Sequence, residues 1–347
     1  MIQQRAQWKM YLWTMLIIFI ICLILVVFNY FQKDQPEVAP VFEEQPQEES
    51  TCEMRNKLTG VCQSQQDQDF IYCTMIDNHQ DARPPSGLSQ ADFVFEAIVE
   101  SPITRLLACY NSDKDIEKIG PVRSARPYYI DWTREFMAAY VHVGGSFDAL
   151  DYLKSYAYDM NEFSAGSYFW RDYNKQAPHQ IYTSSDLIKE YVELKQWKIK
   201  NDVEEWIYKD DATQEDRPKE QNIEIDFATF YFLINWEYNK ESNDYLRYQA
   251  GKIHKDEDRT EIRAKNIAVI YTISEPYDDY GRRRTRTVSS GKSVVFRDGI
   301  AIKGEWRRPD LKHRTRFYDQ EGNEIEFNQG TTWLEVVPKH FKEASYE

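Results

Sequence analysis

Positive charge is scarce in this sequence relative to negative charge. Its 347 residues include 43 Lys and Arg against 57 Asp and Glu, which gives a formal net charge of −14 at pH 7. Nucleic-acid binding rests on Lys and Arg side chains that neutralise phosphates. The acidic balance therefore excludes general nucleic-acid binding, and we expect no nucleic-acid partner.

The sequence also lacks the short motifs of several common enzyme classes. It contains no G-x-S-x-G nucleophile elbow, no H-E-x-x-H zinc motif and no P-loop. Its cysteines and histidines do not follow the close spacing of metal ligands. We therefore predict no cofactor and no metal site, and the sequence leaves open whether the chain is an enzyme.

Cysteine is rare, with five residues in the chain, one of which, Cys22, lies in an apolar run. Cys52 and Cys62 flank a nine-residue loop, and we predict a disulfide between them in an oxidising compartment. Cys73 and Cys109 lie within two predicted strands. They would form a disulfide if those strands are neighbours, and would otherwise be buried thiols with a poor setting for nucleophilic chemistry.

Charge is absent from a long apolar run near the N-terminus. Residues 10–31 read MYLWTMLIIFIICLILVVFNYF, and as a helix they would span ~33 Å, about the hydrocarbon thickness of a bilayer. Arg5 and Lys9 precede the run, whereas the two charges that follow it cancel. The positive-inside rule then predicts a cytoplasmic segment 1–9 and an extracytoplasmic remainder, 32–347.

A cleaved signal peptide is the alternative to this anchor. Such a peptide has a shorter apolar region and small residues at its cleavage site, and neither feature is present here. We therefore predict an uncleaved, single-pass anchor in a membrane. Residues 32–51 are rich in acids and proline, which predicts an extended tether.

The folded part divides into two regions by the pattern of its elements. Strands alternate with helices in residues 52–208, which predicts an α/β domain with a mixed sheet. A polar linker, 209–222, leads to short strands separated by Gly, Asn and Asp turns, which predict a β-rich domain over 223–342. The predicted fold class is thus α+β after one transmembrane helix.

Within the first region, buried strands are expected at 70–76, 93–100, 104–110 and 140–145. Helices are expected at 124–137, 146–156 and 184–196, each opened by serine as a candidate N-cap.

Long stretches of both regions resemble the YerB-like bacterial envelope proteins. In the first region the similar stretches are MIDNHQDARPPSGLSQADFVFEAIVE, ITRLLACY, IGPVRSARPYYIDW, YVHVGGS and RDYNKQAPHQIYTS. In the second they are NWEYNKESNDYLRYQAGKIHKDEDRTEIRAKNIAVIYT and GIAIKGEWRRPDLKHRTRFYDQEGNEIEFNQGTTWLEVVPK. The resemblance covers most of residues 58–338 and implies an extracytoplasmic, two-domain protein of a family that is usually lipid-anchored. This sequence lacks a lipoprotein cysteine, so lipidation is not expected.

Polar residues at strand ends are the first candidates for a functional site. Asp77, Asn78 and His79 close a predicted buried strand, a position that often carries sites in α/β domains, although an Asx-type turn would explain them equally well. Arg171 and His179 flank a loop that matches the Arg…Ala-Pro-His pattern of the resemblance. A plain surface loop is the alternative for this pair.

Further candidates concern anions and proton transfer. Arg123 and Arg126, at the start of a predicted helix, would bind a carboxylate or phosphate unless they pair with acids. His142 lies before Gly144 and Gly145, whose amides could cradle an anion, although a lone strand histidine is more often a core residue.

Glu96, Glu100, Thr104 and Arg105 are polar residues on apolar strands. The two glutamates could act as acid and base if they meet, whereas a Glu–Arg bridge across a hairpin is the plainer account.

Two functions follow from these candidates. One is a non-catalytic envelope protein that binds a wall component or an envelope protein through polar residues of the first domain. The other is an enzyme that acts on an anionic substrate such as peptidoglycan or another wall glycopolymer. In that case Arg123 and Arg126 would clamp the anion, a histidine would handle protons, and Asp77 would orient that histidine.

Overall fold

The computed structural model describes residues 2–32, 55–63, 70–100, 102–200 and 203–347. It forms two compact units, Met1–Thr51 and Cys52–Glu347, which are described separately. The predicted tether 32–51 and Cys52 fall almost entirely outside the described residues.

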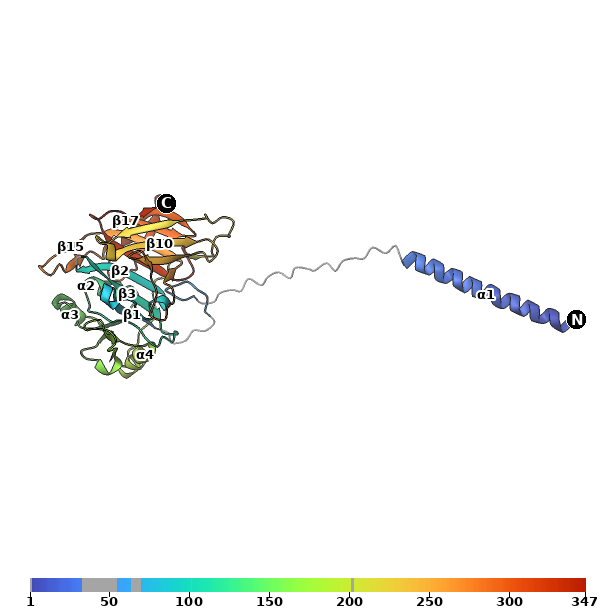
Figure 1. Cartoon of the computed structure of the whole chain (residues 1–347), viewed down its shortest axis with the longest axis horizontal. Coiled ribbons are helices and arrows are strands. Elements are labelled where there is room, and N and C mark those ends of the chain that lie inside the picture. The colour runs from blue at the N-terminus through green and yellow to red at the C-terminus, as the bar shows by residue number, and fades with distance from the viewer. Residues whose placement is uncertain (1, 33–54, 64–69, 101, 201–202) are drawn as a thin grey trace. The chain divides into compact units, whose positions relative to one another are not determined.

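The first unit contains one helix, α1 (Ile2–Gln32), shown in blue in Figure 1. Its stretch Leu12–Tyr30 is long and apolar enough to cross a membrane, and the described residues contain no second helix of this kind. The helix predicted for residues 10–31 is therefore present.

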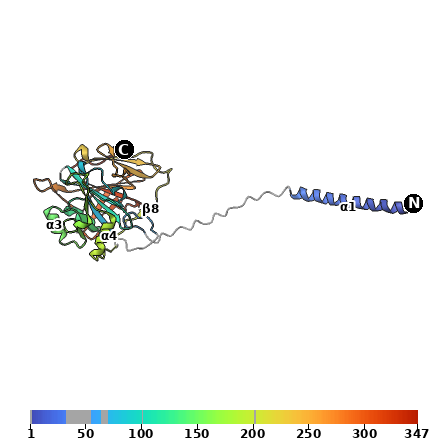
Figure 2. The same ribbon diagram turned by 60° about the horizontal axis from the view of Figure 1, so that its bottom comes forward.

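In the second unit, the region before residue 200 alternates strands with three α-helices. Its strands are β1 (Ile71–Asp77), β2 (Phe93–Glu100), β3 (Ile103–Asn111), β4 (Ala139–His142), β5 (Asp159–Asn161), β6 (Trp170–Arg171) and β7 (Ile181–Tyr182). Its helices are α2 (Pro127–Arg134), α3 (Phe147–Leu153) and α4 (Ser185–Leu194). Helices α3 and α4 lie at the end of this unit opposite the C-terminus (Figure 1), and they keep that place in the turned view of Figure 2.

The region after residue 200 is strand-rich, as predicted. Its strands are β8 (Tyr208–Lys209), β9 (Asn222–Asp226), β10 (Leu233–Asn239), β11 (Asp244–Gln249), β12 (Lys252–Ile253), β13 (Arg263–Ala264), β14 (Asn266–Thr272), β15 (Ser274–Pro276), β16 (Arg283–Thr285), β17 (Ser289–Arg297), β18 (Ile300–Arg308), β19 (Arg316–Asp319), β20 (Phe327–Asn328), β21 (Thr332–Pro338) and β22 (Ser345–Tyr346).

One mixed sheet of ten strands runs through both regions. Its order is β19-β18-β17-β14-β21-β2-β3-β1-β4-β5. The regions meet where β2 pairs in parallel with β21, with Val94 opposite Trp333 and Glu96 opposite Glu335. The fold is therefore α+β with a mixed sheet, as the sequence predicted, but the two regions share that sheet.

Each face of the large sheet is covered by a separate hydrophobic core. A second sheet has the order β12-β11-β10-β9-β22, with β13 paired to β11. One face of the large sheet packs Tyr72, Val94 and Leu106 against residues of this second sheet, such as Trp236 of β10. The other packs Cys73 and Phe95 against α2 residues such as Trp132. The long apolar strands β1, β2 and β3 follow from this burial, because strands covered on both faces need no polar alternation.

Two of the three predicted helix starts are confirmed. The hydroxyl of Ser146 accepts a hydrogen bond from Ala149 N, and that of Ser184 accepts one from Leu187 N. The third was wrong, because Ser124 does not cap a helix there. Helix α2 begins at Pro127 with Arg126 as its N-cap, since proline suits the first helical position and disfavours helical backbone in the residue before it.

A disulfide joins the two central strands of the first region. Cys73 of β1 and Cys109 of β3 are directly opposite each other and are bonded. This confirms the pairing that was expected if these strands were neighbours. Cys62 is also disulfide-bonded, whereas its predicted partner Cys52 lies outside the described residues.

Candidate functional site

The C-terminal ends of several parallel strands meet at one edge of the large sheet. Strands β1 and β4 are parallel, as are β4 and β5, and β3 runs antiparallel to β1 so that Arg105 lies opposite Asp77. Side chains that follow these strands are brought together because parallel strands end on the same side. Most of the candidates predicted from the sequence belong to this edge.

Asp77, the last residue of β1, binds both a histidine and an arginine through one carboxylate oxygen. Its Oδ2 lies 2.6 Å from Nδ1 of His179 and 2.8 Å from Nε of Arg123. Its Oδ1 accepts a hydrogen bond from the backbone N–H of His79 at 2.9 Å. Burial by itself would raise the pKa of Asp77, but these partners outweigh it and lower the pKa to about 2. Asp77 is therefore ionised at neutral pH.

His179 comes from the loop between β6 and β7, about a hundred residues later in the chain. Because Nδ1 donates its proton to Asp77, Nε2 of a neutral ring carries the free lone pair. The sequence-based hypothesis that Asp77 orients a histidine thus agrees with the geometry around His179.

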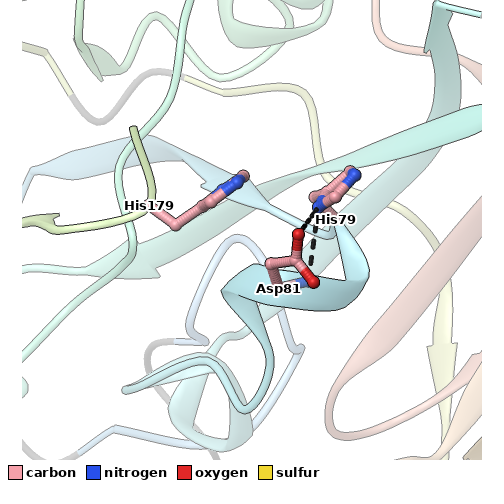
Figure 3. Close-up of side chains that lie close together, drawn as sticks. All are labelled: His79, Asp81 and His179. Carbon is pink, nitrogen blue, oxygen red and sulfur yellow. Dashed lines mark hydrogen bonds and ion pairs between the residues drawn. The ribbon is translucent and has the colours of Figure 1, made fainter. Parts of the chain in front are cut away.

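His79 stacks on His179 and closes the cluster on the solvent side. The ring centroids are 5.0 Å apart and the planes differ by 10°. The ring of His79 caps the short 3-10 helix Gln80–Ala82, since its Nδ1 accepts a hydrogen bond from Asp81 N at 3.2 Å. Figure 3 shows the two rings with the Asp81 carboxylate beside His79.

Arg123 is fixed from both its backbone and its side chain. Its N–H donates to Met75 O at 2.8 Å, and its carbonyl accepts from Val143 N at 3.0 Å, which places the residue between β1 and β4. The side chain is 23% exposed. Within the described residues, its terminal Nη1 and Nη2 groups have no hydrogen-bond partner. Burial lowers the pKa of Arg123 and Asp77 opposes that shift, but an arginine keeps its charge at neutral pH.

Asn78 and Glu96 belong to a buried network behind this edge. Glu96 Oε1 accepts hydrogen bonds from Thr104 at 2.6 Å and from Asn78 Nδ2 at 3.1 Å. Its other oxygen pairs with Arg247 of β11, and neither side chain is exposed. A ligand at the surface would not reach these groups. The contacts of Asn78 and Glu96 therefore support a structural role and give no support to the predicted ligand roles.

The same network contains two further titratable groups, Glu335 and His254. Burial, and next the charge of Glu96, hold the pKa of Glu335 well above its usual range. Burial and then Arg247 hold the pKa of His254 well below its usual range. Nδ1 of His254 lies 2.5 Å from Nη1 of Arg247, which fits a neutral imidazole that accepts the bond.

Arg105, Arg126 and Glu100 form a separate ionic group. Arg126 pairs with Glu100, and Arg105 lies 3.6 Å from the same carboxylate while donating to Ser124 O at 2.7 Å. The expected anion clamp of Arg123 with Arg126 is not supported, because each arginine binds its own carboxylate. Glu96 and Glu100 do not meet as an acid–base pair either, and the Glu–Arg bridge across the β2–β3 hairpin is the arrangement found.

Both ring nitrogens of His142 have bonding partners at this edge of the sheet. Its Nε2 lies 2.6 Å from Asp159 Oδ1, and its Nδ1 lies 2.6 Å from the carbonyl of Gly144. Both ring nitrogens therefore already have partners within the protein. These contacts support a structural role for His142 and give no support to the predicted proton-transfer role.

The turn at Gly144 and Gly145 also makes its contacts within the protein. The N–H of Gly144 donates to Asn161 Oδ1 at 3.0 Å. Gly144 has φ +55°, and a Cβ there would lie 2.9 Å from the Phe163 ring. These glycines serve the turn and the packing against Phe163 and Ala125, so the expected amide cradle for an anion is not supported.

Arg171 lies at the end of β6 and binds Glu162 at 2.9 Å. It flanks the loop that carries His179, as predicted, but the two side chains share no contact in the described part of the chain. Arg171 therefore supports the loop and does not join the cluster of His79, Asp77, Arg123 and His179.

Three residues at this edge escaped the sequence-based prediction: Asp81, Arg83 and Lys175. Arg83 donates to the carbonyls of Asn78 and Tyr231, each at 2.9 Å. Lys175 Nζ lies 3.3 Å from Arg83 O. Asp81 lies two residues after His79, and that short spacing was the one available signal. Nothing in the local sequence marked the other two.

A cavity of about 490 Å³ lies elsewhere, where Lys118 meets Asp256 and Glu257. Lys118 binds Asp172 at 2.7 Å and Glu257 at 2.6 Å. None of the residues predicted from the sequence lines this cavity. The candidate residues predicted from the sequence therefore lie apart from this cavity, at the edge beyond β1.

Comparisons with known proteins agree with this fold. Residues 58–198 match the N-terminal domain, and residues 223–334 the C-terminal domain, of a family described as protein of unknown function (DUF3048). The chain is 34% identical over 271 residues to the "Putative lipoprotein YerB" of Bacillus subtilis (strain 168), which covers 76% of this chain and 80% of that one. A crystal structure of the YerB protein from Bacillus subtilis superposes with a TM-score of 0.75 and 31% identity, over 85% of this chain and 99% of the other. This chain therefore belongs to the YerB-like, DUF3048 family.

Proposed function

We propose that this protein is a membrane-anchored component of the bacterial envelope that binds an anionic group of a wall component without chemical conversion. The relative's name describes a lipoprotein, which a lipid would hold at a membrane. Here α1 would serve as the anchor, with the N-terminus in the cytoplasm and the second unit outside. The Cys73–Cys109 disulfide fits an oxidising compartment.

One observation carries the binding proposal. Nε of Arg123 forms an ion pair with the buried Asp77, and no residue in the described part of the chain accepts a hydrogen bond from its two terminal amino groups. A guanidinium edge of this kind matches the two oxygens of a carboxylate or phosphate. Arg83 lies near the end of the same strand, β1, bonded to the carbonyl of Asn78, and adds positive charge.

The overall charge limits the kind of ligand. A protein with net charge −14 repels long anionic polymers at distances comparable to the Debye length of ~8 Å at physiological salt. Attraction would therefore be local to Arg123, through hydrogen bonds to one discrete anionic group. We expect binding to change little with salt compared with a basic polymer-binding protein.

The enzymatic alternative is favoured by a different observation, the 2.6 Å contact between Asp77 and His179. A carboxylate that orients a histidine leaves Nε2 able to accept a proton from a substrate or water. In this case the same edge would convert an anionic wall substrate. The candidate acids and bases at Glu96, Glu100 and His142 are all engaged elsewhere, which makes binding the better supported function.

The test uses the full chain in detergent with purified cell-wall sacculi. The pellet is assayed for bound protein and the supernatant for released fragments by mass spectrometry. We expect co-pelleting without new fragments, and loss of co-pelleting in Arg123→Gln. The matched control is Arg307→Gln, an exposed arginine that pairs with Glu305. Fragments that disappear in His179→Ala would establish the enzymatic alternative, and equal pelleting of all variants would refute the binding site.

A further inference from the structure

Two imidazoles and a carboxylate lie together at the edge beyond β1. One ligand atom from each of His79, Asp81 and His179 lies within 4.8 Å of the other two. Figure 3 shows the three side chains converging from two separate segments, the 3-10 turn after β1 and the β6–β7 loop. This set of donors is typical of transition-metal sites in proteins.

We propose that His79, Asp81 and His179 bind a divalent transition-metal ion of the Zn²⁺ type. The proposal goes beyond the anion site, which rests on Arg123. Imidazole nitrogen favours Zn²⁺ and its neighbours over Mg²⁺ or Ca²⁺, which prefer oxygen ligands. Three protein ligands leave one tetrahedral position open to water or to a ligand.

His179 is already arranged as a metal ligand. Its Nδ1 bonds to the Asp77 carboxylate at 2.6 Å, and metal-binding histidines usually donate the second ring N–H to a carboxylate or carbonyl in this way. The contact fixes the tautomer and the ring orientation and leaves Nε2 free. No partner for Nε2 occurs among the residues that the structure describes, although the side chain is only 11% exposed.

His79 and Asp81 supply the movable part of the site. Metal–ligand bonds of ~2.0–2.1 Å require tetrahedral ligand atoms ~3.3 Å apart, so the widest of the three separations, which is at most 4.8 Å, must shorten by at most ~1.5 Å. The Asp81 side chain is 68% exposed and lies 3.5 Å from Nδ1 of His79, so it can turn at little cost. The His79 ring would rotate out of its stack on His179 and exchange its bond from Asp81 N for the metal.

The experiment measures Zn²⁺ and Co²⁺ binding by the full chain in detergent, without wall material. Metal-free protein is dialysed against Zn²⁺ and the bound metal is counted, and Co²⁺ is titrated to follow the visible absorption of a low-coordinate site. We expect one ion per chain, loss of the ion in His179→Ala and His79→Ala, and weaker binding in Asp81→Asn. Asp77→Asn should lower the affinity ~10–100-fold as an outer-shell change.

The matched control is His313→Ala, because His313 is an exposed histidine that binds a nearby carboxylate, Asp310, at 2.8 Å. This variant should bind one ion as tightly as the wild type. Equal binding by the His79, His179 and His313 variants, or absence of the Co²⁺ band, would overturn the proposal. Should His179→Ala fail to fold, the variants of His79 and Asp81 at the surface decide the outcome.

The two proposals fail separately. Arg123→Gln should keep the Co²⁺ band and lose wall binding. If the wild type shows no Co²⁺ band but still pellets with sacculi, the metal site alone is refuted. A normal band with no pelleting of the wild type would refute the anion site alone.

Discussion

At the scale of single residues, Asp77 connects the strand end to both partners of the candidate site. Its Oδ2 contacts His179 and Arg123 at 2.6 and 2.8 Å, so one carboxylate fixes the histidine tautomer and pairs with the charge of the guanidinium. The sequence placed Asp77 at a strand end. It did not show that its partners would come from residue 123 and residue 179, because both contacts depend on how distant segments pack.

The lowered pKa of Asp77 gives a test by pH. The folded pKa of about 2 lies below the unfolded value of about 3.9, so the ionised carboxylate adds stability above about pH 4, and this is lost as the pH falls toward 2. We expect Asp77→Asn to lower the free energy of unfolding by about 2 kcal/mol at pH 7 and by much less near pH 2. Urea unfolding at both pH values measures the difference, with the exposed Asp81→Asn as control. A loss of equal size at both would contradict the assigned role.

Substitution by glutamine should change the free energy of unfolding in opposite directions at the two buried residues Glu96 and Glu335. Glu96 is the counter-charge of the fully buried Arg247, so Glu96→Gln should cost about 3–5 kcal/mol, the usual penalty of an unpaired buried charge.

Glu335 has a raised pKa, so its favourable contribution is complete below about pH 4 and is lost as the pH rises toward the folded pKa. Glu335→Gln does not titrate and should gain stability relative to the wild type between pH 5 and pH 8. Thermal unfolding of the wild type and Glu335→Gln across this pH range measures the difference in stability. A Glu96→Gln variant as stable as Glu335→Gln would show that the charges are assigned to the wrong residues.

At the scale of elements, the bond between β1 and β3 is the clearest covalent support of the fold. Cys73 and Cys109 are 36 residues apart in the sequence, and closing a loop of that length limits the unfolded chain. We expect Cys73→Ala with Cys109→Ala to lower the free energy of unfolding by about 3–4 kcal/mol. Urea unfolding of the oxidised wild type and the double variant measures it. The control is Cys22→Ala, which removes the unpaired Cys22. Equal stability of the wild type, the double variant and Cys22→Ala would contradict a stabilising disulfide between β1 and β3.

The elements that the sequence predicted well are those whose signals are local. Ser146 and Ser184 cap α3 and α4 as expected, since a hydroxyl before an apolar periodic segment is a sufficient start signal. Ser124 failed because Pro127 moved the start of α2 to a later residue. Strand β1 was recognised from its continuous apolar run.

The elements that the sequence could not place are those joined by distant pairing. The two regions appear separate in sequence, yet β2 and β21 lie side by side, and Arg247 of β11 neutralises Glu96 of β2. No periodicity or spacing reports a contact across 151 residues. For the same reason Arg126 and His142 were plausible ligands on the sequence, and only their packing against Glu100 and Asp159 removes them from the site.

At the scale of the whole molecule, α1 and the second unit give a test of topology. The proposal places the N-terminus in the cytoplasm and residues 52–347 outside. Protease added to intact protoplasts should therefore degrade the second unit and spare a tag at the N-terminus, and the tagged fragment should stay with the membrane. Replacement of Arg5 and Lys9 by Gln is expected to weaken this orientation. Protection of the second unit from protease would contradict the proposed location.

The central claim is that Arg123 binds an anionic group of the wall, and its affinity for soluble wall fragments tests this most directly. Calorimetry would compare the wild type, Arg123→Gln and Arg307→Gln, with one fragment that offers carboxylates and another that offers phosphates. A charge-assisted hydrogen-bonded pair is worth about 1.5–3 kcal/mol, so Arg123→Gln should weaken binding ~10–100-fold while Arg307→Gln leaves it unchanged. Equal affinity of Arg123→Gln and the wild type for both fragments would contradict the account.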